Sequence, residues 1–242
     1  MVELRNLTAG YGEKTVIRDI SLTFPPGTVT AILGVNGCGK STLLKAAAGL
    51  IPLMGGEVLA DEPRARNIAY LPQSRRLPEL TAGRLVLHGR FPWLGWPRTY
   101  CPADHAAARA AMERLGVAQF ADTPMSQLSG GTRQKIYLAM ALAQEAPTIL
   151  LDEPTSFLDP AHQLRFLELC RSLAAEGRAV AAVLHDLPLA LRFADRLAVM
   201  DGGRLVALGT TNEIMSTDIL QKTFGVRIFP VQTPLGTQYV CG

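Results

Sequence analysis

The order of apolar and polar positions along the chain predicts alternating strands and helices. Residues 2–8 and 16–24 alternate around a turn at 10–12, which is typical of paired strands with one buried face. Residues 28–33 form a nearly continuous apolar run, typical of a strand buried on both faces. A stretch with helix composition follows at 42–50. This part of the chain therefore predicts antiparallel strands followed by a buried strand and a helix.

The same alternation returns later in the chain, after a long helical stretch. Residues 83–145 carry helical patterns, and no strand-like run divides them. Apolar runs at 148–152, 179–184 and 197–200 predict further strands, with helices between them. The pattern as a whole predicts an α/β fold in which a helical insertion interrupts a parallel-sheet core.

Composition describes an ordinary globular chain of 242 residues, in which 48% are hydrophobic and 19% are charged. The longest uninterrupted apolar stretch, residues 136–143, is far shorter than the roughly 18 residues that a membrane span needs. The first residues lack the pattern of a signal peptide, so we expect a cytosolic chain. The widely spaced cysteines predict reduced thiols; they are Cys38, Cys101, Cys170 and Cys241.

The charge is unevenly distributed along the chain. The formal net charge is +3, yet residues 64–114 hold nine arginines against Glu79, Asp104 and Glu113, a balance of +6, which leaves −3 for the remainder. Such a block is typical of a surface for an anionic partner, and a solvated helical face is the alternative interpretation.

A phosphate-binding loop is predicted between the buried strand at 28–33 and the helix that follows it. Residues 34–41 match G-x-x-x-x-G-K followed by Ser or Thr, in the strand-loop-helix context that the motif requires. Its glycines let backbone N–H groups face a polyphosphate, while lysine supplies a positive charge and serine an oxygen for Mg²⁺. The expected nucleotide contacts in this segment are Gly34, Asn36, Gly37, Cys38, Gly39, Lys40, Ser41 and Thr42.

A pair of carboxylates ends the apolar run at 148–152. In a parallel sheet, the end of this strand lies at the same edge as the phosphate loop. Asp152 can therefore bind in the Mg²⁺ shell, and Glu153 can orient and polarise an attacking water.

Because Cys38 lies inside the phosphate loop, we expect alkylation of its thiol to inhibit nucleotide hydrolysis. We also expect bound nucleotide to protect the thiol from alkylation.

The segment at 128–134, Leu-Ser-Gly-Gly-Thr-Arg-Gln, resembles the signature motif of the ATP-binding cassette family and lies between the two motifs above, as in that family. The resemblance covers essentially the whole chain. It implies a P-loop NTPase (RecA-like) core with an antiparallel β subdomain at 1–82 and 146–215. It further implies an inserted α-helical subdomain at 83–145 and a short C-terminal extension at 216–242.

The resemblance also implies roles for residues outside these motifs. It implies that Tyr11 stacks on adenine, that Gln73 is the glutamine of the Q-loop and that His185 is the switch histidine. It places Asp159 in the D-loop, at 156–159. The resulting expectation is that Glu153, His185, Lys40 and Gln73 are catalytic, and that Ser41, Gln73 and Asp152 hold Mg²⁺ beside ATP.

The signature residues Ser129, Gly130 and Gly131 open a predicted helix, and a helix N-terminus attracts anions. The resemblance implies that this terminus faces the γ-phosphate held by another copy, so that a homodimer sandwiches two ATP molecules head to tail. Thr132 departs from the family, which most often has glutamine there. We expect the phosphate contact to survive, because the three residues before it are intact.

A lone, short cassette favours an ATPase subunit of a transporter over the nucleic-acid and ribosome members of the family. The resemblance implies an importer with separate transmembrane permease subunits and, indirectly, a substrate-binding protein. It implies a peripheral position at the cytoplasmic face of the inner membrane and no nucleic acid as partner. An export or lipid-handling ATPase is a further alternative, and the short end of the chain predicts no metabolite-sensing domain.

The cargo is inferred from likeness alone. Several stretches resemble importers of ferric siderophores, haem and vitamin B12, among them 88–92, 141–144 and 156–163. Others are also similar to manganese, zinc and molybdate importers. Because the basic block at 64–114 spans the region that faces the permease in this family, we expect its arginines to surround the docking groove, near anionic lipid. The residues predicted to support assembly are Arg75, Arg76 and Arg90.

Overall fold

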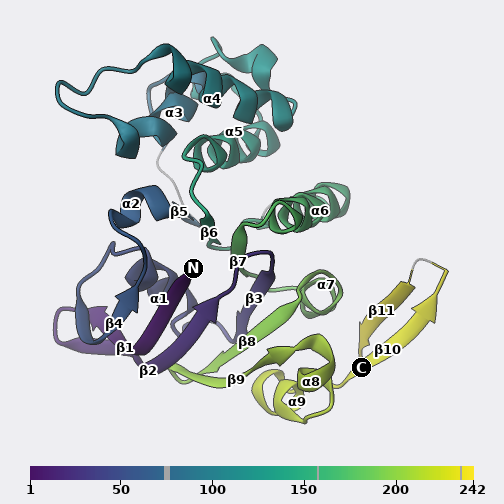
Figure 1. Cartoon of the computed structure of the whole chain (residues 1–242). Coiled ribbons are helices and arrows are strands. Elements are labelled where there is room, and N and C mark those ends of the chain that lie inside the picture. Colours follow the sequence, from purple (N-terminus) through teal and green to yellow (C-terminus); the bar gives the residue numbers. More distant parts are fainter. Residues whose placement is uncertain (74–76, 157, 235) are drawn as a thin grey trace.

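The computed structural model of the chain describes residues 1–73, 77–156, 158–234 and 236–242. Figure 1 shows three groups of elements: the sheets with their covering helices, a helical group that contains α3, α4 and α5, and a C-terminal hairpin. Arg75 and Arg76 of the basic block and Phe157 of the 156–159 segment lie outside the described residues. Within the described part of the chain, no helix combines the length and apolar character needed to cross a bilayer.

Two sheets form the body of the molecule. An antiparallel sheet has the order β2-β1-β4, and a six-stranded sheet has the order β5-β6-β7-β3-β8-β9, in which the β8–β9 pair is antiparallel and the others are parallel. The strands of the two sheets are β1 (Val2–Tyr11), β2 (Lys14–Phe24), β3 (Val29–Gly34), β4 (Leu53–Leu59), β5 (Ile68–Leu71), β6 (Thr148–Leu151), β7 (Ala179–Val183), β8 (Arg196–Asp201) and β9 (Arg204–Thr210). This confirms the predicted α/β fold with a parallel-strand sheet.

Helices connect the strands and cover the sheet. The α-helices are α1 (Lys40–Ala47), α2 (Arg64–Asn67), α3 (Ala82–Leu87), α4 (Pro102–Arg114), α5 (Gly130–Ala143), α6 (Pro160–Ala175), α7 (Leu187–Phe193), α8 (Thr211–Met215) and α9 (Ile219–Phe224). Short 3₁₀ helices are η1 (His88–Trp93), η2 (Ala118–Phe120) and η3 (Met125–Gln127), and the terminal hairpin is β10 (Ile228–Thr233) with β11 (Gly236–Cys241).

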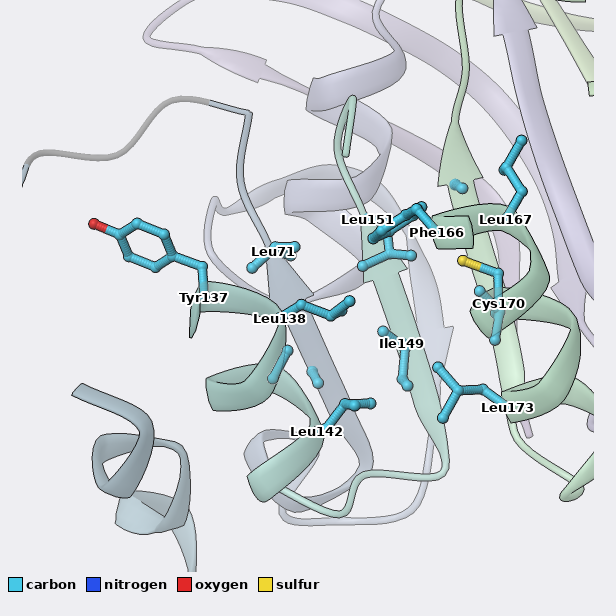
Figure 2. Close-up of a cluster of buried hydrophobic side chains, with 14 of the residues drawn as sticks. Leu71, Tyr137, Leu138, Leu142, Ile149, Leu151, Phe166, Leu167, Cys170 and Leu173 are labelled. Carbon is cyan, nitrogen blue, oxygen red and sulfur yellow. The ribbon is translucent and has the colours of Figure 1, made fainter. Parts of the chain in front are cut away.

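The central strands β3, β6 and β7 of the six-stranded sheet are buried at every position, so side chains that point to either face of the sheet are covered. In β6, Ile149 and Leu151 pack in one core with α5 and α6, whereas Leu150 packs in a second core with α1 and the antiparallel sheet. Figure 2 shows the first core: side chains of β6 lie between Leu138 of α5 and Cys170 of α6. Two-sided burial explains the continuous apolar runs in the sequence.

The structure corrects the predicted role of Arg90. Its side chain is buried, and its guanidinium donates to Asp104 Oδ1 at 3.0 Å, Glu145 Oε2 at 2.6 Å and the carbonyl of Ala143 at 2.9 Å. These bonds join η1 to the start of α4 and the end of α5. Because a buried guanidinium needs such partners, Arg90 is a structural residue of the helical group and is not available to a docking partner.

Several element boundaries differ from the sequence prediction. Within the predicted helical stretch at 83–145, helix α4 begins at Pro102, where the Asp104 carboxylate accepts the backbone N–H of Cys101 and caps the helix. The segment after 215 contains α9 and the β10–β11 hairpin, where the sequence predicted no more than a short extension. The alternation of apolar and polar residues in β10 is interrupted by Pro230, so the sequence pattern does not predict this strand.

Candidate nucleotide site

Four neighbouring strands bring the predicted site residues to one edge of the six-stranded sheet. The strands β5, β6, β7 and β3 are parallel neighbours, so their carboxyl ends lie side by side. The segments that follow these four ends carry Gln73, the pair Asp152 and Glu153, His185, and the phosphate loop at 34–41. In open α/β sheets this edge is where ligands bind.

The glycines of the phosphate loop are required by close approach and by backbone conformation. Gly34 has φ 152°, and a Cβ there would lie 2.4 Å from the carbonyl oxygen of Met200 and 2.6 Å from Cys38 Sγ. Gly39 has φ 104°, and a Cβ would lie 2.5 Å from Ile17 Cγ2. Side chains at either position would displace the loop, which explains why the motif demands glycine.

Lys40 closes the loop on itself. Its Nζ donates to the carbonyl oxygens of Gly34 at 2.7 Å and Val35 at 3.0 Å, and its side chain is buried. The ammonium thus lies inside the curl of the loop, where the N-terminus of α1 begins. A polyphosphate in this curl would meet both the ammonium and the helix terminus, as the sequence predicted.

Ser41 and Asp152 form the oxygen-rich part of the site. Ser41 Oγ donates to Asp152 Oδ1 at 2.9 Å, and the hydroxyl of Tyr70 donates to Asp152 Oδ2 at 3.0 Å. Burial raises the pKa of the Asp152 carboxyl, and the two hydroxyl donors oppose this shift. A hydroxyl and a carboxylate are hard oxygen donors of the kind that Mg²⁺ binds together with phosphate oxygens, so the residues fit this ion.

Glu153 lies at the centre of a polar cluster made by three strand ends. Its carboxylate accepts from Gln73 Nε2, from His185 Nε2 at 2.7 Å and from Ser156 Oγ at 3.2 Å. The backbone of Glu153 has φ 50°, a left-handed conformation that is uncommon outside glycine. The structure therefore brings together the predicted residues Gln73, Glu153 and His185 around one carboxylate.

Cys38, whose alkylation is expected to inhibit hydrolysis, lies in a buried environment inside the phosphate loop. Its side chain is 5% exposed, and burial raises the pKa of the thiol, although the nearby ammonium of Lys40 opposes the shift. Because the thiolate is the nucleophile, a buried thiol with a raised pKa is slow to alkylate. Burial raises the pKa of the Cys170 thiol further, to about 12. All four cysteines are free thiols, as predicted.

Tyr11 and Asp159 lie outside the central cluster. Tyr11 is exposed at the end of β1, with Lys45 Nζ 3.5 Å from its hydroxyl and 5.9 Å from its ring centroid. Asp159 caps α6: its carboxylate accepts the backbone N–H of His162 at 2.9 Å and contacts His162 Nδ1 at 2.7 Å. These bonds lower the pKa of the Asp159 carboxyl.

The signature residues form a separate, exposed helix terminus. Ser129 caps α5 by accepting the backbone N–H of Thr132 at 3.3 Å, and the two hydroxyl oxygens lie 2.9 Å apart. Gly130 is exposed and Gly131 is half-buried, and a Cβ at either would meet nothing within 4 Å. In the described part of the chain, no hydrogen bond or ion pair joins these signature residues to the phosphate loop or to Glu153.

Three supporting residues were not singled out from the sequence. Tyr70 bonds Asp152 and Ser156 bonds Glu153, as described above. Gln134 Nε2 donates to the carbonyl of Pro154 at 2.7 Å and so ties the second turn of α5 to the segment after Glu153. Alternation along β5 could have placed Tyr70 on one face of the strand, but no local signal links Gln134 to a carbonyl 20 residues away.

The chain matches known proteins along most of its length. Residues 17–156 match the family model described as ABC transporter. The ferric enterobactin transport ATP-binding protein FepC of Escherichia coli (strain K12) is 39% identical, over 97% of this chain and 91% of that protein. The hemin import ATP-binding protein HmuV of Pseudomonas fluorescens (strain Pf0-1) is 39% identical, over 96% of this chain and 95% of that protein.

A solved structure agrees with these matches. An inward-facing conformation of a metal-chelate type ABC transporter has a chain that superposes with a TM-score of 0.88 at 28% identity, covering 100% of this chain and 97% of that chain. The similarity thus extends over both the sheets and the helical group.

Proposed function

The chain belongs to the ABC transporter family as an ATP-binding ATPase, and from this premise we propose that it energises import through separate permease subunits. The observation that carries the proposal is the convergence of Lys40, the Ser41–Asp152 pair and the Glu153 cluster at one sheet edge. This edge therefore places three groups side by side: a phosphate-binding loop, oxygen donors for Mg²⁺ and a carboxylate that can act as a base. Nucleotide hydrolysis requires all three.

The proposed roles follow from the contacts in the site. Lys40 and the backbone of the phosphate loop hold the phosphates, Tyr11 stacks on adenine, and Ser41, Asp152 and Gln73 hold Mg²⁺. Bound Mg²⁺ would neutralise phosphate charge. Glu153 takes the proton of the attacking water, once Gln73 releases the carboxylate oxygen that it bonds in this structure. His185 orients the carboxylate through its 2.7 Å contact.

We further propose that two copies of the chain complete each ATP site. The helix terminus at Ser129–Gly131 has no bond to its own phosphate loop within the described residues. Ser129 and Gly130 are exposed there, and exposed backbone donors at a helix N-terminus suit an anion. In a head-to-tail homodimer this terminus would contact the γ-phosphate held by the other copy, and Asp159 would lie in the D-loop at the interface.

The helical group offers a groove for the permease. A groove of about 700 Å³ lies between α3, α4 and η2, with Leu87 and Met112 among its apolar lining and Arg84 and Arg109 at its border. We propose that this groove receives a segment of the permease. The groove would belong to an α-helical subdomain at 83–145, which is inserted into a core formed by 1–82 and 146–215. This assignment moves the predicted basic docking surface from Arg90 to Arg84 and Arg109.

The proposed cargo is a ferric siderophore or haem, because two relatives of the chain are a ferric enterobactin transport ATP-binding protein and a hemin import ATP-binding protein. Cobalamin is included because the sequence also resembles importers of vitamin B12. Manganese, zinc or molybdate import is the second candidate, and action on nucleic acid or ribosomes is a remote one. The subunit would lie peripherally at the cytoplasmic face of the membrane, and a substrate-binding protein would act with the permease on the opposite side.

Uptake measurements test this proposal. We expect a strain that lacks the chain to lose uptake of a labelled ferric siderophore, haem or cobalamin, and the wild-type chain to restore it. The control is Lys40→Ala, which keeps the helical group and is expected to copurify with the permease without restoring uptake. Loss of manganese, zinc or molybdate uptake instead would support the second candidate. ATP hydrolysis that depends on added RNA or DNA would overturn the transporter role.

A further inference from the structure

An aromatic segment projects from the helical group. Residues 91–101 contain both tryptophans of the chain, Trp93 and Trp96, and no aspartate or glutamate. Trp96 is 93% exposed, the largest exposed fraction among the exposed large hydrophobic residues of the described chain. Figure 1 shows the connection that leads into α4 extending away from the sheets. An indole ring left fully in water needs a physical explanation, because it forgoes the burial that such a large apolar side chain normally gains.

The two tryptophans differ in what surrounds them. Trp93 Nε1 donates to the carbonyl of Gln144 at 2.8 Å, and the guanidinium carbons of Arg66 and Arg90 lie 5.1 and 5.2 Å from its ring centroid. Packing of the helical group therefore accounts for Trp93. No such contact is described for Trp96, which lies in a turn closed by the bond from Arg98 N to Gly95 O.

Charge and apolar surface are mixed in this segment. The guanidinium of Arg98 lies 4.8 Å from the ring centroid of Phe91, and both side chains are exposed. Tryptophan is enriched at the boundary between membrane and water, where its ring lies among lipid headgroups and its N–H stays hydrated. A basic residue beside it adds attraction to anionic lipid.

We propose that the turn at 95–98 is a lipid contact that inserts Trp96 into the headgroup region of an anionic bilayer. Leu94, Gly95, Pro97 and Arg98 flank the ring in the chain, and the guanidinium of Arg98 lies over the ring of Phe91, so apolar and basic groups are mixed here as an anionic headgroup region favours. The inference rests on the proposed function, since the helical group must face the membrane. It adds a contact with lipid beside the contact with the permease.

Trp96 supplies its own probe. In Trp93→Phe, Trp96 is the sole tryptophan, so intrinsic fluorescence reports on this turn alone. We expect its emission to shift to the blue on addition of phosphatidylcholine–phosphatidylglycerol vesicles, and to be quenched by brominated lipid. Should Trp93→Phe fold poorly, the difference between the wild-type and Trp96→Phe spectra gives the same information.

Cosedimentation with the same vesicles measures the affinity. We expect Trp96→Ala to lower the bound fraction several-fold and Arg98→Gln to lower the partition coefficient about fivefold. The matched control is Phe229→Ala, which removes an exposed aromatic ring from the C-terminal hairpin and is expected to leave binding unchanged. ATP hydrolysis of the isolated subunit should not change in any of these variants.

Two results would overturn the lipid contact. One is an emission spectrum unchanged by saturating vesicles together with equal cosedimentation of Trp96→Ala and the wild-type chain. The other is a blue shift that requires detergent-solubilised permease and is absent with vesicles, which would make the turn a protein contact. Either result leaves the proposed function intact if labelled cargo uptake still depends on the chain, so the two failures are distinguishable.

Discussion

The phosphate-loop end and the signature end of the proposed site differ in how far one copy of the chain completes them. At the phosphate-loop end, three charged side chains have partners from the same copy: Lys40 bonds loop carbonyls, Asp152 accepts from Ser41, and Glu153 accepts from His185. At the signature end, Ser129 bonds a residue of its own helix, Gly130 is exposed and Gly131 is half-buried. The first end is preorganised, and the second presents donors to something outside the chain.

This difference means that assembly of the proposed homodimer would control hydrolysis. A preorganised half-site binds nucleotide without a large rearrangement. In the proposed homodimer, the donors that complete this half-site arrive when two copies meet, so we expect turnover to depend on association.

The largest expected effect comes from Glu153→Gln. The amide keeps the shape of the side chain but cannot accept a proton from water, so we expect turnover to fall about 10²- to 10⁴-fold while ATP binding remains. Size-exclusion chromatography with ATP should then show an accumulated dimer. Hydrolysis at the wild-type rate would show that Glu153 is not the base.

Ser129→Glu, made together with Glu153→Gln, tests the signature end. A carboxylate facing a γ-phosphate places like charges together, which costs several kcal/mol at an interface, so the ATP-dependent dimer should decrease at least about tenfold. Binding of ATP to the single chain should stay unchanged. Ser126→Glu, three residues away and also exposed, is the control. Weakened ATP binding by the isolated chain would show that the signature acts within one copy.

Cysteine labelling separates the interior of the loop from the surface. Cys101 and Cys241 are exposed, whereas Cys38 is buried with a raised pKa, so its thiolate fraction at neutral pH is small. We expect alkylation of Cys38 by N-ethylmaleimide to be on the order of tenfold slower than that of Cys101, and to accelerate at higher pH than Cys101 does. Peptide mass spectrometry measures each rate. Equal rates would indicate that the loop opens readily.

The smallest expected effect is that of Thr132→Val, which keeps the shape of the side chain and removes its hydroxyl. A hydroxyl oxygen can accept two hydrogen bonds and donate one. The N–H and Oγ–H groups of Thr132 can both donate to Ser129 Oγ, which leaves the hydroxyl proton of Ser129 to donate to a phosphate. We expect kcat/KM for ATP to fall about two- to tenfold. Thr132→Ser should restore it. A loss of the same size in Thr132→Ser would point to packing instead.

The sequence predicted what depends on local patterns. Continuous apolar runs identified β3 and β6, and the spacing of glycines and Lys40 identified the phosphate loop, because each of these signals lies within a few consecutive residues. Assignment of Gln73 and His185 needed a family resemblance, since neither residue has a distinctive local context. The parallel sheet then brings both to Glu153, as the hydrogen bonds of the site show.

Features that depend on distant partners could not be predicted. In the sequence, Arg90 is one of several arginines in a basic block. Its guanidinium can be buried because the carboxylates of Asp104 and Glu145, which lie later in the chain, form ion pairs with it. Cys38 has a loop context that is typical of exposure, yet Gly34 packs closely enough to cover it. For both residues the role depends on the solvent exposure of the side chain, and the pattern of residue types along the sequence does not determine that exposure.

The left-handed backbone of Glu153 links catalysis to the evolution of stability. A glycine at φ 50° would relieve steric strain of about 1–2 kcal/mol, so Glu153→Gly is expected to fold at least as well as the wild-type chain while losing the base. Selection for stability or expression alone would therefore favour an inactive subunit that can still occupy the permease. Directed evolution of such a subunit needs a selection for transport at every round, because at this position stability and turnover favour different residues.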